Sequence, residues 1–407
     1  MKQMWVFLLA VLVSTSMWGQ KVVLSGYVSN AKSGSKIALA CVAVPHTDLS
    51  VVTNDDGFFT LKVDSLPSVL WVSHLGFHTA QVALAAHEDA SLHIALQPAS
   101  ETLREVVVRT MDPGELLRQA IKKIPSNYGK TPELYHCFYR ETAMKQQRFI
   151  YVAEGVVDMY KTAYDEGNAH DRVAIVKGRR LLSPRQGDTL GIKVMGGPVQ
   201  PIQLDIAKNT VFLLNEDVLA YYSFTMEGTA YINDRPQYVL RLVPETSLSP
   251  VALYRGLLYI DQERLAFTRA ELSLDMSNRE KATRYMLVRK PVGVRFKPKE
   301  LSCLIDYRTE NGTTYLSYIR NTFRFDCDWK RRLFSTTFTA SCEMVVTDRS
   351  QNRAHPLSGR VSFDSRDRFF DRVQYFEDPA FWEDYNIIEP TETLDKAIDK
   401  LLKQAKR

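Results

Sequence analysis

Four histidines are the first candidates for chemistry, because imidazole is a common ligand of metal ions. They are His46, His74, His78 and His93. His74 and His78 are four residues apart, which would bring them together on a helix, but the segment around them is predicted as a strand followed by a glycine turn. Residues i and i+4 of a strand lie about 13 Å apart, too far to share one ion. The sequence therefore predicts structural histidines and no metal site.

Catalytic motifs are a second possible source of chemistry. No HxxE, HExxH or GxSxG occurs, so the common zinc-peptidase and esterase signatures are excluded. The Gly-Gly pair at 196–197 lacks the spacing of a phosphate-binding loop. Acidic pairs such as Glu154/Asp158 and Glu383/Asp384 are expected by composition, since the chain holds 47 acidic residues. The sequence predicts no catalytic residue and no cofactor, and a hydrolase with dispersed catalytic residues is the alternative that it leaves open.

A basic cluster is the one candidate for a binding site. It consists of Lys177, Arg179, Arg180 and Arg185, which could contact anionic headgroups or a glycan. Residues 161–215 interrupt the β-pattern, so a solvated loop explains the same cluster. Over the whole chain 52 basic residues are interleaved with 47 acidic ones, and the net charge is only +5. Nucleic acid is therefore not indicated as a partner.

The five cysteines are widely spaced, and no CxxC motif occurs. A chain of this length needs no disulfide framework, so buried thiols are the default prediction. Three of the five are close enough in sequence that one pair could be oxidised across neighbouring strands in an oxidising compartment. These three are Cys303, Cys327 and Cys342, and the other two are Cys41 and Cys137.

The N-terminus predicts export. Lys2 gives a positive start, residues 4–13 form an unbroken apolar run, and Gly19 is a small residue suited to cleavage. This arrangement over residues 1–20 is typical of a secretory signal peptide and is too short to span a membrane, although a buried first strand or helix is an alternative. No cysteine follows the run before Cys41, so no lipid anchor is predicted. The mature chain is expected in the periplasm or at the outer membrane, without a transmembrane segment.

Residues 21–97 predict a small β-sandwich. Short apolar runs alternate with polar turns there, which suits about seven strands. Asp56-Gly57 stands between two apolar runs and predicts a hairpin, because glycine accepts the positive φ that such a turn requires.

The same segment resembles a known family. The runs are GYV at 26–28, TNDDGFF at 53–59 and HLGF at 74–77. They resemble the carboxypeptidase regulatory-like domain, a transthyretin-like sandwich, although Phe77 stands where that family usually has tyrosine. The resemblance implies an accessory module without peptidase activity, of the type carried by exported proteins of the Bacteroidota.

A polar linker at 98–112 leads out of the sandwich and includes a short valine-rich strand. Asp112-Pro113 then has the residue types of a helix start. Apolar residues follow at helical spacing, which predicts an amphipathic helix over 113–124 that ends at Pro125.

Residues 113–375 predict a large antiparallel domain that begins with this helix. Polar turns separate pairs of strands, and the strongest of the turns is Asn311-Gly312. Two later strands are expected at 333–348 and 360–363. The predicted hairpins join 135–144 to 149–160, 223–232 to 237–243, 256–261 to 265–276, and 303–309 to 313–320.

One block of this domain resembles the half-barrel of lipoprotein carriers. It reads YVLRLVP at 238–244, GLLYID at 256–261 and FTRAE at 267–271. The resemblance implies a curved sheet whose apolar face, covered by a helix, could hold an acyl chain. A sheet whose apolar face is filled by its own side chains fits the same residues equally well.

Residues 376–407 combine an aromatic segment with a terminal amphipathic helix. The predicted fold is therefore mainly β: a transthyretin-like sandwich, then a large antiparallel curved sheet or half-barrel with one or two packed helices. The predicted function is non-enzymatic binding in the envelope, with a protein, lipid or glycan as partner. A lipid or lipoprotein carrier is the second hypothesis, and the hydrolase is the third.

Overall fold

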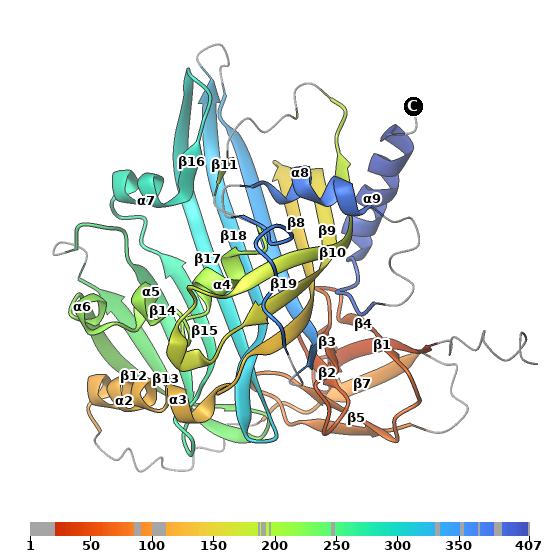
Figure 1. Cartoon of the computed structure of the whole chain (residues 1–407), viewed down its shortest axis with the longest axis vertical. Helices are drawn as coiled ribbons and strands as arrows, with labels where there is room; N and C mark the ends of the chain where they lie inside the picture. The colour runs from red at the N-terminus through yellow and green to blue at the C-terminus, as the bar shows by residue number, and fades with distance from the viewer. Residues whose placement is uncertain are drawn as a thin grey trace, which may run out of the picture.

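The computed structural model divides the chain into a small N-terminal sandwich and a large sheet with most of its helices on one face (Figure 1). The predicted signal peptide at 1–20 and nearly all of the linker, with its valine-rich strand, lie outside the described residues. The structure describes residues 21–84, 91–99, 111–185, 188, 193–194, 197–245, 249–329, 334–350, 354–364, 367–377 and 385–405.

Two sheets form the sandwich, with the strand orders β4-β1-β7 and β3-β2-β5-β6. In β4 every second residue is buried, as expected for a strand with one face on a core. Val28, Leu61 and Leu70 are among the fully buried side chains of the sandwich core. The sandwich prediction is thus confirmed. The strands are β1 (Val22–Asn30), β2 (Cys41–Ala43), β3 (Ser50–Val52), β4 (Phe58–Val63), β5 (Val69–Ser73), β6 (Ala80–Ala83) and β7 (Leu92–Leu96).

The turn at Asp56-Gly57 forms, but the hairpin predicted from it is wrong. Gly57 has φ = 73°, and the Asn54 side chain accepts hydrogen bonds from the backbone N–H groups of Asp56 and Phe58. However, β3 pairs with β2, and β4 pairs with β1. The chain therefore crosses between the two sheets at this turn, because the turn residues fix the local bend but not the strand that each arm pairs with.

The large sheet has ten antiparallel strands in the order β10-β9-β8-β19-β18-β17-β15-β14-β13-β12. It consists of two meanders that β19 and β8 join, and it is not closed into a barrel. The predicted large antiparallel sheet, expected to be curved or a half-barrel, is thus present. Its strands are β8 (Glu133–Lys145), β9 (Arg148–Lys161), β10 (Arg172–Leu182), β12 (Tyr222–Ile232), β13 (Arg235–Pro244), β14 (Tyr254–Asp261), β15 (Phe267–Leu274), β17 (Val294–Glu310), β18 (Thr313–Trp329) and β19 (Thr336–Ser350). A separate pair is β11 (Lys193–Val194) with β16 (Leu287–Arg289).

All four predicted hairpins of the large sheet are confirmed. At the strongest signal, Asn311 and Gly312 have φ values of 49° and 83°. Two successive positive values are those of a type I′ turn, whose twist matches that of the flanking strands.

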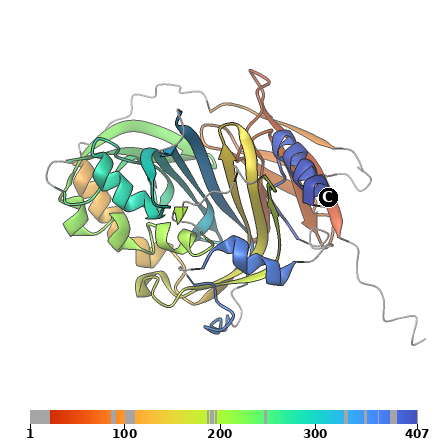
Figure 2. The ribbon, with the colours of Figure 1, turned by 90° about the horizontal axis from the view of Figure 1, so that it is seen from above.

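Side chains of the large sheet alternate between a core face and an outer face. On β8, Cys137 and Tyr139 belong to the main core, whereas Phe138 and Arg140 point to the outer face. Short helices and their connections cover the core face, and the sandwich and α9 lie on the outer face (Figure 2). The helices are α2 (Pro113–Lys122), α3 (Ile124–Asn127), η1 (Tyr164–Glu166), α4 (Gln200–Leu204), α5 (Thr210–Leu213), α6 (Glu216–Leu219), α7 (Arg279–Met286), α8 (Phe369–Val373), η3 (Gln374–Phe376) and α9 (Glu392–Ala405).

Three local predictions need correction. Pro125 does not end helical structure but stands in the first turn of α3, where its missing N–H costs no hydrogen bond. The strand predicted at 360–363 is only a single bridge between Ser362 and Ala174. The region 161–215 contains the regular strand β10, in addition to short helices.

All five cysteines are free thiols, four of them buried and Cys41 half-buried. Cys303 and Cys342 both stand beside Asn321, on the two strands that flank it, so a whole strand separates them. Within the described ranges, no helix is long and apolar enough to cross a membrane.

Candidate functional site

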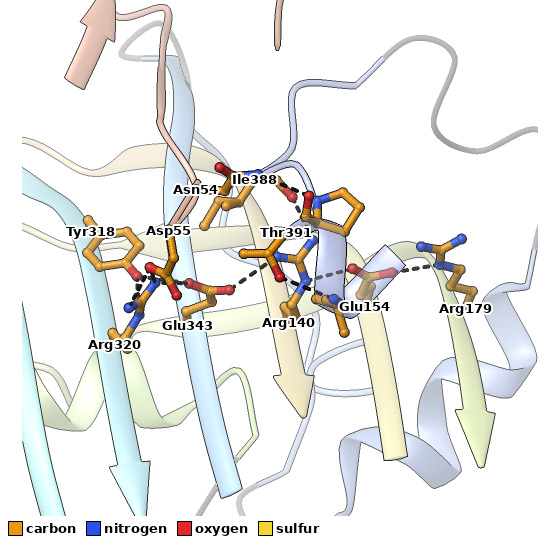
Figure 3. Close-up of polar contacts among 12 residues, drawn as sticks. Asn54, Asp55, Arg140, Glu154, Arg179, Tyr318, Arg320, Glu343, Ile388 and Thr391 are labelled. Carbon is orange, nitrogen blue, oxygen red and sulfur yellow. Dashed lines mark hydrogen bonds and ion pairs between the residues drawn. The ribbon is translucent and has the colours of Figure 1, made fainter. Parts of the chain in front are cut away.

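Five charged residues form one row across the outer face of five adjacent strands (Figure 3). They stand directly opposite one another in the strand register, so positive and negative charges alternate along the row. We call them the charged row: Arg179 on β10, Glu154 on β9, Arg140 on β8, Glu343 on β19 and Arg320 on β18.

Arg140 is the centre of the charged row. Its Nε donates to Glu154 Oε1 at 2.6 Å, and its Nη1 donates to Glu343 Oε1 at 3.2 Å. Arg179 and Arg320 complete the row from the two ends, with distances of 2.6 Å to Glu154 and 3.2 Å to Glu343. Only 4% of the Arg140 side chain and 1% of the Glu154 side chain are exposed. Ions this deeply buried are stable only when they are paired.

The charges hold one another in the ionised state. Burial alone would raise the pKa of the Glu343 carboxyl, but Arg320 and Arg140 beside it bring that pKa below its usual value. Burial alone would lower the pKa of Arg140, but Glu154 and Glu343 raise it. Glu343 and Arg140 therefore favour the ionised state of each other at neutral pH.

Two distant segments of the chain close over the charged row. Arg140 Nη2 donates to the backbone oxygen of Ile388 at 2.6 Å. From the sandwich, Asp55 accepts from Arg320 at 3.2 Å, and Asn54 donates to the backbone oxygen of Pro390 at 3.0 Å. Figure 3 shows the sandwich turn and the C-terminal segment meeting above the strands. The charged row thus connects the sandwich, the large sheet and the C-terminus.

An open groove of about 390 Å³ lies beside the charged row on the outer face of β14, β15, β17 and β18. Arg320 is shared between the charged row and this groove. Arg269 and Glu271 add further charge, and Ser273 and Ser302 add hydroxyl groups. The groove is open, and its lining mixes charged, hydroxyl and apolar side chains, which suits a surface of another molecule better than an acyl chain. A second hollow, of about 370 Å³, lies at the start of α7.

The core face contains a buried ionic cluster around Asp205. Neither Asp205 nor Lys161 exposes more than 1% of its side chain, and Lys161 Nζ donates to Asp205 Oδ2 at 2.6 Å. Two tyrosine hydroxyls also donate to this carboxylate, from Tyr164 at 3.1 Å and from Tyr307 at 2.8 Å. Asp205 follows α4, so the cluster fastens the α4 segment to the sheet.

Of the four predicted anion-contacting residues, three lie on β10 and not in a solvated loop. Arg179 pairs with Glu154, Arg180 pairs with Glu377 at 3.4 Å, and the Lys177 ammonium lies 5.7 Å from the Tyr385 ring. The Arg180 guanidinium also covers the Phe370 ring at 4.5 Å. The fourth, Arg185, is exposed beyond the end of the strand. Contact of these residues with an anionic ligand stays a prediction, and Arg179 and Arg180 already have internal partners.

The histidines do not gather around a common point. His74 Nδ1 contacts its neighbouring backbone oxygen on Leu75, and His78 Nδ1 lies 2.8 Å from Asp234 on the β12–β13 turn. In the part of the chain that the structure describes, no three residues of the types His, Cys, Asp or Glu are placed to hold a metal ion.

A family model identifies the N-terminal unit. The model of the CarboxypepD_reg-like domain matches residues 24–108. Residues 24–108 are a CarboxypepD_reg-like domain. The resemblance inferred from the sequence is therefore confirmed for this part of the chain. A search of curated proteins gave no match.

Solved structures resemble the middle and C-terminal region of the chain only loosely. A putative outer membrane lipoprotein-sorting protein domain from Vibrio parahaemolyticus aligns over 60% of this chain and 95% of its own, with 10% identity and a TM-score of 0.26. A LolA superfamily protein from Nitrosomonas europaea aligns over 60% and 96%, with 13% identity and a TM-score of 0.22. MucB in complex with MucA(peri) aligns over 60% and 100%, with 11% identity and a TM-score of 0.18. Such low TM-scores say nothing about function.

The CarboxypepD_reg-like domain has a second ionic contact with the sheet. Arg349 of β19 donates to Asp48 of the domain at 2.7 Å and to Glu133 of β8 at 3.0 Å. Its guanidinium carbon lies 3.6 Å from the centre of the Tyr315 ring, and only 1% of its side chain is exposed. The domain is therefore fixed to the sheet by the buried Arg349 and the half-buried Arg320.

Asn386 ties the C-terminal segment to the CarboxypepD_reg-like domain. Its side chain accepts from the backbone N–H of Lys62 at 2.7 Å and donates to the backbone oxygen of Lys62 at 3.0 Å. Replacing Asn386 by alanine is expected to cost about 1–3 kcal/mol, because the buried backbone groups lose their partner. Limited proteolysis should then cut residues 385–391 faster than in the wild type. The matched control is Gln203→Ala, at an exposed amide side chain, and equal cleavage rates in both variants would contradict the prediction.

His136 predicts a small dependence of stability on pH. Its hydrogen bond to Asp158, at 2.8 Å, raises the pKa of the imidazole, and Asp348 adds to the shift. A raised folded-state pKa gives stability that is complete below the unfolded pKa of about 6.5 and is lost as the pH rises through the folded pKa. The effect should be a fraction of a kcal/mol, because 39% of the side chain is exposed and water screens the pair. Urea midpoints of wild type and His136→Gln should converge as the pH rises, and a gap that widens would contradict this.

Proposed function

We propose that this protein is a non-enzymatic binding protein of the bacterial envelope, which holds a partner protein on the outer face of its large sheet. The observation that carries the proposal is the filling of the core face. Residues from α2 to α8 occupy that face together with the side chains of the sheet. A binding surface must then lie outside, and the groove beside the charged row is the part of the outer face that we assign to the partner.

The filled core face argues against the carrier hypothesis. An acyl chain needs an apolar cavity, but Leu117, Leu213 and Met286 of three different helices belong to the same buried cluster as the strands. Asp205 and Lys161 form an ion pair within this core. An apolar ligand beside this pair could not solvate its charges.

The pairing of the buried charges argues against the hydrolase hypothesis. Acid-base catalysis needs carboxyl groups that change their protonation state near neutral pH. Arg320 and Arg140 hold the pKa of the Glu343 carboxyl below its usual value. Glu154 lies between two arginines, and Asp205 accepts from Lys161 and two tyrosine hydroxyls, so their oxygens are already occupied by internal partners. The envelope location that we propose rests on the predicted signal peptide at 1–20.

Native mass spectrometry of the mature chain, released gently from its own envelope, tests the proposal. A second protein bound to the chain is the expected result. A bound mass in the lipid range would support the carrier hypothesis instead. A monomer without any bound molecule would contradict the proposed binding of a partner protein.

Substitution in the groove then tests the assigned surface. Ser273→Trp should lower the amount of bound partner by about tenfold or more, since a large side chain in a contact surface prevents close packing. Ser223→Trp is the matched control, because Ser223 is an exposed serine on β12, outside the groove. If both variants lost the same amount of bound partner, or if neither lost any, the groove would not be the partner-binding surface.

A further inference from the structure

Apolar side chains are exposed where β16 turns into β17. Pro291 to Val294 form a tight turn that Gly293 permits with φ = 80°. Val292 stands at the head of this turn with a relative exposure of 103%, and Val288 on β16 is 55% exposed. The turn therefore presents a branched apolar side chain entirely to solvent.

Phe334 extends this apolar surface from the neighbouring strands. It is 83% exposed. Val294 pairs with Trp329 across β17 and β18. The last pair of β18 and β19 is Cys327 with Thr336. Beyond this pair the Ser335 hydroxyl donates to Asp328, which places the neighbouring Phe334 at the end of β18. We call Val288, Val292 and Phe334 the apolar tip. It lies at the end of the long strands β17 and β18, far from the sandwich (Figure 1).

Positive charge accompanies the apolar tip. Arg289 and Lys290 stand between its two valines, and both are exposed. Acidic groups of β18 near the tip are neutralised by lysines of β17. These pairs are Lys297 with Asp328, at 2.6 Å, and Lys299 with Asp326, at 3.1 Å.

This combination fits one kind of partner. Single exposed apolar residues are ordinary, but a narrow projecting group of them beside exposed cations has the composition of a membrane-surface anchor. The apolar side chains enter the boundary between headgroups and acyl chains, and the cations contact anionic headgroups. We propose that the apolar tip inserts into the surface of a membrane that contains anionic phospholipids. This site goes beyond the proposed partner groove, and none of its three residues lines that groove.

Vesicle sedimentation with the chain from Lys21 onward tests the proposal, because that chain contains every described element. Vesicles of phosphatidylethanolamine with phosphatidylglycerol should sediment the protein, and vesicles of phosphatidylcholine alone should not. The double variant Val292→Asp/Phe334→Asp should bind to the anionic vesicles at least about tenfold more weakly than the wild type. The pair Arg289→Glu/Lys290→Glu should lose binding in the same way, and raising the salt from about 0.1 M to about 1 M should weaken the wild type.

Val211→Asp is the matched control, since Val211 on α5 is 69% exposed and lies outside the apolar tip. It should sediment like the wild type, and circular dichroism should show all variants folded. Equal binding by the tip variants, or equal binding to both kinds of vesicle, would overturn the proposal. A concentration-dependent dimer that the tip variants lose would identify a contact between copies and overturn it as well. The vesicle experiment is independent of the proposed partner groove, because the tip variants leave the groove unchanged and Ser273→Trp leaves the tip unchanged.

Discussion

Replacing Arg140 by methionine is expected to lower the free energy of unfolding by about 3–5 kcal/mol. The substitution removes the cation between Glu154 and Glu343 and leaves each carboxylate with one partner in the charged row, Arg179 or Arg320. It also removes the hydrogen bond from β8 to the backbone of Ile388, while the apolar packing of Ile388 with Phe138 remains. Urea titration should show a lower midpoint with an unchanged slope if the chain still unfolds in one step.

An exposed ion pair provides the control for Arg140→Met. Arg284 and Glu280 on α7 are both more than 70% exposed, as their side chains show 73% and 74% exposure. Arg284→Met should cost no more than about 0.5 kcal/mol, because water screens such pairs. Equal losses from the two substitutions would mean that the charged row contributes no more than a surface contact.

The sequence was sufficient to predict most of the local pairing. Asn311-Gly312 and the polar residues around Gln146 mark turns whose positive φ values the structure confirms. The turn between β8 and β9 sets Lys145 opposite Arg148, and a β-bulge between Ala143 and Met144 then shifts the register by one residue, which brings Arg140 opposite Glu154. This pair of opposite charges within predicted strands was the signal that could have indicated the charged row.

The rest of the charged row could not be predicted in this way. Glu343 meets Arg140 because β19 returns to β8 across about two hundred residues, and no local pattern carries that register. The contacts of Asp55 and Ile388 depend in turn on how separately folded units dock.

The strand β10 was missed for a different reason. Its register shifts between Ile175 and Lys177, which breaks the alternation of side chains. Gly178 then stands on the core face, where a Cβ would lie 2.1 Å from the Val373 side chain of α8. The close approach of a helix thus requires glycine at a position where the sequence pattern predicts a large apolar residue. Short helices such as α5, with four residues, are too short to show a helical period.

Replacing Asp205 by alanine should have an effect of similar size, about 3–5 kcal/mol, because Lys161 would stay buried without its counter-ion. The same change removes the acceptor of the Tyr164 and Tyr307 hydroxyls. The α4 segment should then detach from the core face and expose apolar surface. An increase in the fluorescence of a dye that binds apolar surfaces, measured without denaturant, is the expected readout together with a lower urea midpoint.

Two comparisons make the Asp205 result decisive for the function of the core face. Asp165→Ala, at an exposed carboxylate in η1, should change stability by less than about 0.5 kcal/mol and leave dye binding unchanged. Asp205→Asn keeps an acceptor for the hydroxyls, so it should lose less stability than Asp205→Ala while still leaving Lys161 unpaired. Lower stability without dye binding in Asp205→Ala would mean that α4 holds its place by apolar contacts alone. If Asp205→Ala were as stable as the wild type and bound a fatty acid tightly, the core face would be a ligand site, and the proposed binding protein would have to be replaced by a carrier.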